Sequence, residues 1–166
     1  MYNHFQYSEK ICKALKPFSW SQENGSFFRA TEQTELQELN ENISNAQGLI
    51  MIAINPAASA FQFHNSDSLM RRIPYSMVIV NQTSSTDTDS IFNSQSKCEN
   101  IAIEICSRIM CDARQYRNGC ELIDPDSFTI EGIGPIGDNF YGVMLQFEAV
   151  QPVIYKPNQN LWKKWD

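Results

Sequence analysis

The sequence predicts an α+β fold in which an antiparallel sheet packs against one long central helix, with one or two further helices near the amino terminus. Two observations lead to this prediction. Apolar residues recur with a helical period over residues 91–116, and short apolar or alternating runs typical of strands lie before and after that stretch. The order helix, helix, strand, strand, long helix, strand, strand places the sheet on the long helix.

Length and net charge limit the number of domains and the kinds of partner that we expect. A chain of 166 residues suits one domain, which we expect over residues 1–156, followed by an extension over 157–166. The net charge of −6 repels phosphate backbones, so nucleic acid is a poor first candidate for a partner. The first residues, MYNHFQYSEK, do not resemble a secretory signal, and no apolar run is long enough to span a membrane. We therefore expect a chain that is made and folded in the cytoplasm.

Two helices are predicted in the first part of the chain. In residues 7–16, Ile11, Ala14 and Leu15 share one helical face, and Pro17 ends the run. A second helix is predicted over 32–46, because apolar residues recur there at helical spacing before a terminating Gly48.

Two strands follow, joined by a long connection. Residues 49–55, LIMIAIN, form a continuous apolar run that indicates a buried strand, and residues 75–82 indicate the next strand. The connection over 55–74 is longer than a hairpin needs. It therefore contains either an additional edge strand around AFQFH or an arm that contacts another molecule.

The longest predicted element is the helix over 91–116, after a polar segment, TSSTDTDS, that is rich in helix-capping residues. Its buried stripe consists of Cys98, Ile101, Ala102, Ile105, Cys106, Ile109, Met110 and Ala113. Its solvent face consists of Lys97, Glu99, Glu104, Arg108, Asp112 and Arg114. Gly119 ends the segment, and the aspartates of DPDS at 124–127 indicate a turn rather than a calcium loop.

The last two strands are predicted at 128–133 and 140–150, where apolar and polar residues alternate, with GIGPIGDN between them. A phosphate-binding loop needs its glycines between a strand and a helix. Here a strand follows instead, and Pro135 removes a backbone donor. We interpret the stretch as a hairpin in which Gly134, Gly137, Asp138 and Asn139 supply positive-φ positions.

No catalytic, cofactor-binding or metal-binding residues are predicted. The five cysteines lack metal-ligand spacing and are expected to be reduced, several of them buried as small apolar residues. His64 could be combined with Asp67 and Ser66 or Ser68 into a triad, but nothing resembling a nucleophile elbow surrounds these serines. A plain loop histidine is the preferred interpretation.

Six residues are predicted to contact a protein partner. Arg71 and Arg72 lie in the long connection, as do two phenylalanines of the AFQFH segment, Phe61 and Phe63. Two further candidates, Trp162 and Trp165, flank a pair of lysines at the end of the sequence. Basic residues among aromatics also occur in proteins that bind single-stranded nucleic acid, but the negative net charge favours a protein interface.

The chain resembles the tail-terminator, tail-completion and neck proteins of tailed bacteriophages over residues 27–150. The similarity is carried by the segment FFRATEQTELQELNENISNAQGLIMIAIN, by EICSRIMCD in the long helix, and by the aromatic-glycine strand NFYGVMLQFE. The resemblance implies a non-enzymatic virion subunit, assembled in the host cytoplasm, that forms a ring of identical copies, often sixfold. Its implied neighbours are the tail tube and the neck or connector proteins, with DNA passing through the lumen.

The alternative hypothesis is a small, non-enzymatic α+β binding module, such as a secretion-system or immunity-type partner protein. A module of this kind would be monomeric or dimeric. Molecular mass in solution therefore separates the two hypotheses.

Overall fold

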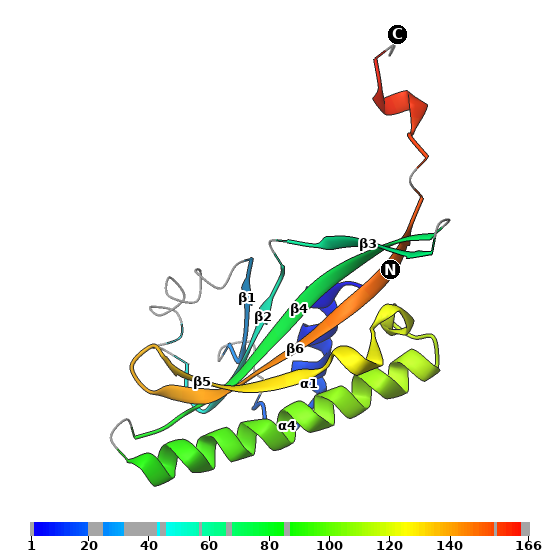
Figure 1. Ribbon diagram of the computed structural model, residues 1–166. Coiled ribbons are helices and arrows are strands. Elements are labelled where there is room, and N and C mark those ends of the chain that lie inside the picture. Colours follow the sequence, from blue (N-terminus) through cyan, green and yellow to red (C-terminus); the bar gives the residue numbers. More distant parts are fainter. Residues whose placement is uncertain are drawn as a thin grey trace.

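A computed structural model describes residues 2–19, 25–31, 43, 46–56, 58–65, 68–84, 87–154 and 156–163. Its described α-helices are α1 (His4–Ala14) and α4 (Thr88–Arg114), and its six strands form one mixed sheet (Figure 1). The strands are β1 (Phe27–Ala30), β2 (Leu49–Ile54), β3 (Ala60–Asn65), β4 (Ser68–Gln82), β5 (Thr129–Ile136) and β6 (Phe140–Val153), with short 3-10 turns η1 (Cys120–Leu122), η2 (Pro125–Ser127) and η3 (Gln159–Leu161). The predicted α+β class and long central helix are confirmed.

The sheet has the order β1-β2-β4-β6-β5, and β3 pairs separately with β4. The prediction of an antiparallel sheet was wrong in one respect, because β1 runs parallel to β2. β1 was not predicted at all: it has only four residues, and its burial does not alternate. The other strand pairs are antiparallel, and β4 pairs with β6 across the intervening helix.

β4 begins at Ser68, well before the predicted start of that strand at residue 75, and β3 occupies the predicted edge-strand position. β3 pairs with β4 up to Arg72, and β2 pairs with it from Ser76 onward. Pro74 lies between these two neighbours, where β4 pairs only with β6. A residue without an N–H group is tolerated at such a gap, which explains how a strand can include this proline.

Both helices pack on one face of the sheet. Tyr7, Ile11 and Cys12 of α1 share a buried cluster with α4 and with odd-numbered residues of β4, such as Met77 and Ile79. α1 starts three residues earlier than predicted, because the Asn3 side chain accepts a hydrogen bond from the Gln6 N–H and caps its first turn. Ala14, predicted for the apolar face, is exposed.

The opposite face carries a second apolar cluster around Ile50, Ile52, Val78 and Val80. Ile43 is fully buried in this cluster and is helical. The predicted helix over 32–46 otherwise falls almost entirely outside the described residues and stays a prediction.

α4 begins at Thr88, three residues before the predicted start at residue 91 and within the predicted capping segment, with the Asp87 side chain accepting a hydrogen bond from the Asp89 N–H. Its predicted stripe faces the sheet, although Cys106, Met110 and Ala113 are only half-buried. The placement of Asp112 on the solvent face was wrong, because this residue is 1% exposed. Donors from α1 and from the segment after α4 reach its carboxylate, and this compensates for its burial.

The β5–β6 hairpin confirms that the glycine-rich stretch connects two strands. Gly134 and Gly137 have positive φ angles, but Asp138 and Asn139 do not, which corrects that part of the prediction. Farther along β6, Gly142 lies under α4: a Cβ atom there would lie 3.0 Å from the Cys98 sulfur and against the backbone of Ile79. The absence of a side chain at Gly142 is what lets the helix approach β6 so closely.

Candidate functional site

The most prominent feature outside the body of the fold is a three-stranded extension, which we call the arm. It consists of β3, residues 68–72 of β4 and residues 150–153 of β6 (Figure 1). β4 and β6 stay paired from Gln82↔Phe140 in the body to Leu69↔Val153 in the arm. The arm is therefore a continuation of the central strands and not a separate loop.

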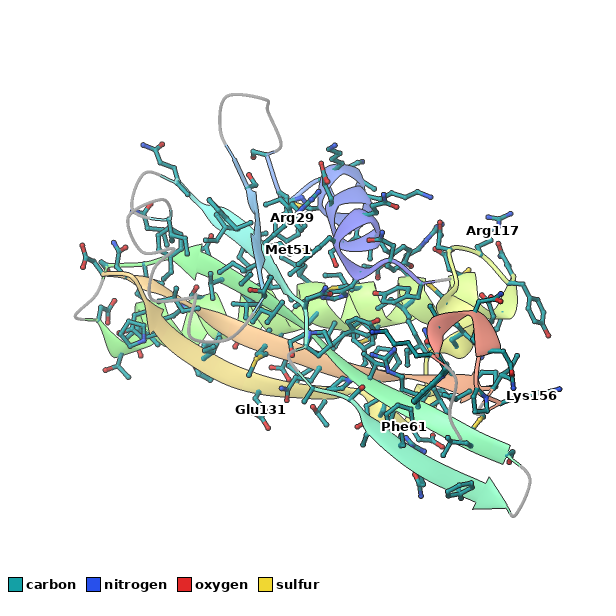
Figure 2. The ribbon with its side chains drawn as sticks, turned by 90° about the horizontal axis from the view of Figure 1, so that it is seen from above. Arg29, Met51, Phe61, Arg117, Glu131 and Lys156 are labelled. Carbon is teal, nitrogen blue, oxygen red and sulfur yellow. The ribbon has the colours of Figure 1, made fainter. Side chains whose placement is uncertain are left out.

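One face of the arm carries the two phenylalanines that the sequence singled out. Phe61 pairs with Arg71, and Phe63 pairs with Leu69, so these four residues share a face. Phe61 is 62% exposed and Phe63 is 63% exposed. Arg71 is also exposed, and its Nε donates a hydrogen bond to the Ser59 hydroxyl at 3.0 Å. Two large apolar rings thus lie in solvent beside a guanidinium group (Figure 2 labels Phe61).

Arg72 lies on the other face of the arm and has intramolecular partners. Its Nη1 donates to Asp124 Oδ2 at 2.9 Å and to Glu148 Oε2 at 2.8 Å. Glu148 and Asp124 raise the pKa of the Arg72 guanidinium, and Arg72 holds the pKa of the Asp124 carboxyl below its usual value. Arg72 therefore ties the arm to the loop after α4, a role that the sequence did not indicate because both carboxylates are distant along the chain.

A cavity of about 350 Å³ opens beside Arg72. β3, β4 and β6 contribute Gln62, Met70, Arg72 and Val150 to its wall, and the loop after α4 contributes Glu121, Leu122, Ile123 and Asp124. Its volume falls in the range of small-ligand sites, and its wall combines apolar side chains with acidic ones. This cavity could not be predicted from the sequence, because its walls come from four separate segments.

After β6 the chain continues as a segment that we call the tail, residues 154 and 156–163. It extends away from the body at the arm end of the molecule (Figure 1). Ile154 is 88% exposed, Leu161 is 80% exposed and Trp162 is 57% exposed. Asn158 caps η3 by accepting a hydrogen bond from the Asn160 N–H at 3.1 Å. Trp165, the other predicted contact residue of this segment, lies outside the described residues.

The arm and the tail lie at the same end of the molecule. Figure 2 labels Phe61 on the arm and Lys156 at the start of the tail, and both lie far from Arg29 beside α1. The structure therefore places the predicted contact residues of the connection, and the tail that carries Trp162, at the same end of the molecule. It separates Arg71 from Arg72, because adjacent residues of a strand point to opposite faces.

The other predicted candidates do not form a site. The side chain of His64, together with Ser66 and Asp67, lies outside the described residues. Asp124 and Asp126 form the predicted turn, in which Asp124 Oδ1 accepts from the Asp126 N–H at 3.1 Å. Among the described residues, no group of three or more His, Cys, Asp or Glu side chains is arranged to hold a metal ion.

A buried polar cluster lies where α1 meets the end of α4. Asp112 Oδ2 accepts hydrogen bonds from the Tyr7 hydroxyl at 2.9 Å and from Asn118 Nδ2 at 3.0 Å. Its Oδ1 forms an ion pair with Arg108 Nη2 at 2.9 Å, without the geometry of a hydrogen bond. This cluster holds α1 against α4 and is a structural feature.

The cysteines are all free thiols. Cys12, Cys98 and Cys120 are buried, Cys106 is half-buried and Cys111 is exposed. The prediction that several cysteines are buried is confirmed, and their reduced state stays a prediction.

In comparisons with protein-family models, curated proteins and solved structures, nothing matches this chain. None of the described helices combines the length and apolar composition that a membrane span needs.

Proposed function

We propose that this protein is a structural subunit of a tailed-phage particle that assembles with copies of itself into a ring at the tail end or at the head–tail neck. The observation that supports this function best is the arm, which presents Phe61 and Phe63 to solvent on strands continuous with the core. Aromatic residues are enriched in the buried centres of protein interfaces. Two exposed rings beside Arg71 therefore mark a surface for a protein partner.

A ring requires each subunit to offer two different surfaces, because a head-to-tail contact joins one surface of a copy to another surface of the next. The arm and the tail are both at one end of this molecule and provide protruding elements for such a contact. The sheet and α4 form the rigid body of each subunit in the ring.

The proposed neighbours are the tail tube on one side and the neck or connector proteins on the other. The subunit is assembled in the host cytoplasm and remains in the virion. Each subunit has a net charge of −6, so the surface of the ring repels the phosphates of DNA that passes through its lumen. These assignments rest on the resemblance of residues 27–150 to tail-terminator and neck proteins.

The proposal is tested by measuring mass in solution over a concentration series, together with negative-stain electron microscopy. Closed rings support it. A particle that stays monomeric or dimeric at all concentrations, both alone and with purified tail tubes, contradicts it and favours the small binding module.

The contribution of the arm is tested with Phe61→Ser and Phe63→Ser in one chain. We expect this variant to lose assembly while keeping the circular dichroism spectrum and melting temperature of the wild type, because both side chains are mostly in solvent. Phe92→Ser is the matched control, since Phe92 is 67% exposed on the outer side of α4. Equal assembly of the arm variant and the control would remove the arm from the interface.

A further inference from the structure

We propose that the tail of one copy docks in the cavity beside the arm of a neighbouring copy, with Trp162 as its apolar anchor. This inference rests on the proposed function, because it names the contact that joins one subunit to the next. The occupant is a second copy of this chain.

The charges of the two surfaces are complementary. Residues 154–163 contain two lysines, Lys156 and Lys163, and no acidic residue. The cavity wall contains Glu121 and Asp124 against the single cation Arg72, and Glu148 lies directly beside it. A basic segment and an acidic cavity attract each other and fix the register in which they meet.

The apolar surfaces are also complementary. Leu161 and Trp162 are 80% and 57% exposed in the tail, and the cavity offers apolar side chains from Met70, Leu122 and Val150. A volume of about 350 Å³ accommodates an indole ring. The Arg72 guanidinium in the same wall provides a cation for the face of that ring.

The direction of the tail favours docking between copies. Within one chain the tail projects from the end of β6 away from the body (Figure 1). Fully extended, residues 154–163 would reach about 33 to 36 Å, and η3 shortens this span. Because the donor surface and the acceptor surface differ, repetition of the contact builds a head-to-tail assembly.

The contact is tested with a fluorescein-labelled peptide of residues 151–166 added to the full-length protein below the concentration at which it assembles, with fluorescence anisotropy as the readout. We expect saturable binding to the wild type. We expect Trp162→Ala in the peptide to weaken binding roughly 30-fold or more, as for a central interface aromatic. No saturable binding at the highest soluble peptide concentration overturns the inference.

The site on the acceptor is tested by charge reversal at Glu121, which is exposed on η1. Glu121→Lys should weaken binding of the wild-type peptide at least about threefold, and Lys163→Glu in the peptide should restore binding to that variant. Glu131→Lys is the matched control, since it makes the same charge change at an exposed position on β5. Equal effects of the Glu121 and Glu131 variants, or no rescue by the Lys163→Glu peptide, overturn the inference.

Failure of this inference and failure of the proposed function give different results. Suppose that the wild type and the Trp162→Ala variant both form rings, with the same affinity between subunits. The ring function then stands, and the tail contact is overturned. If the peptide binds with the expected charge dependence but no ring forms alone or on tail tubes, the contact stands as a subunit contact and the ring function is overturned.

Discussion

His4 makes the stability of this protein depend on pH in a defined window. Its ring is buried and stacks on Tyr75 at 4.8 Å between centroids. Its Nε2 lies 2.9 Å from the Ser76 carbonyl oxygen, which only accepts, so Nε2 carries the proton. The Tyr2 hydroxyl then donates to Nδ1 at 3.2 Å. Burial holds a neutral imidazole here and lowers the pKa of His4 from 6.5 to about 4, despite the hydrogen bond to Ser76.

The size and sign of the effect follow from these two pKa values. Above pH 6.5 the imidazole is neutral in both the folded and the unfolded state, and it adds no pH dependence. Between pH 6.5 and 4 the unfolded chain binds a proton that the folded protein does not, so the free energy of unfolding falls as pH falls. The free energy of unfolding falls by about 1.4 kcal/mol per pH unit, and by about 3 kcal/mol over the whole window.

The assay is urea denaturation at pH values from 7.5 to about 4, followed by circular dichroism, for the wild type and for His4→Gln. Glutamine offers an amide N–H to Ser76 and does not titrate. Glu9 and Asp124, whose carboxyl pKa values are lowered by their basic partners, are present in both proteins and cancel in the difference. A difference between the two proteins that stays constant over this range would refute the reasoning.

Three further predictions concern the core. Gly142→Ala should lower the free energy of unfolding by about 3 kcal/mol in urea denaturation, because the added methyl group meets backbone on one side and Cys98 on the other. Tyr7→Phe should lower it by about 1–3 kcal/mol in the same assay, because a buried oxygen of Asp112 loses a hydrogen bond. Ellman's reagent should react rapidly with Cys111 alone in the native protein, since burial raises the pKa values of the other four thiols.

The two substitutions each have a matched control. Gly25→Ala should be nearly neutral, since nothing lies within 4 Å of a Cβ atom there. Tyr116→Phe should be neutral because Tyr116 is 82% exposed. Similar losses in a variant and its control would show that the stated contact is not the cause. For the cysteines, a second fast thiol before denaturation would contradict the prediction for Cys111 alone, and three or more would contradict the burial of Cys12, Cys98 and Cys120.

The parts of the fold that the sequence predicted are those in which one local signal was enough. The long helix has a periodic apolar stripe and a cap at Asp87, and β6 alternates over most of its length. β1 could not be predicted, because four residues carry too little pattern and their pairing depends on a distant strand. The start of β4 was missed because Pro74 looks like a break, and only the gap between β2 and β3 makes it acceptable.

The candidate surface was predictable only in part. Phe61 and Phe63 stand out in the sequence as aromatics in a long connection, and both are exposed. The engagement of Arg72 by Asp124 and Glu148 depends on contacts across more than fifty positions, so no local pattern reports it. Asp112 was misplaced for the same reason, since its partner Tyr7 belongs to a different helix.

The unbroken pairing of β4 with β6 has a mechanical consequence. A force applied to the far end of the arm along the strands loads the β4–β6 pairing in shear. Many backbone hydrogen bonds between these two strands then bear the force together. A partner that binds Phe61 is therefore held at a fixed distance from α4. The number of strand residues between them sets this distance, at a rise of about 3.3 Å per residue. In an assembly of copies of this chain, the arm would therefore set the spacing between a bound partner and the body, and it would also resist tension along the strands.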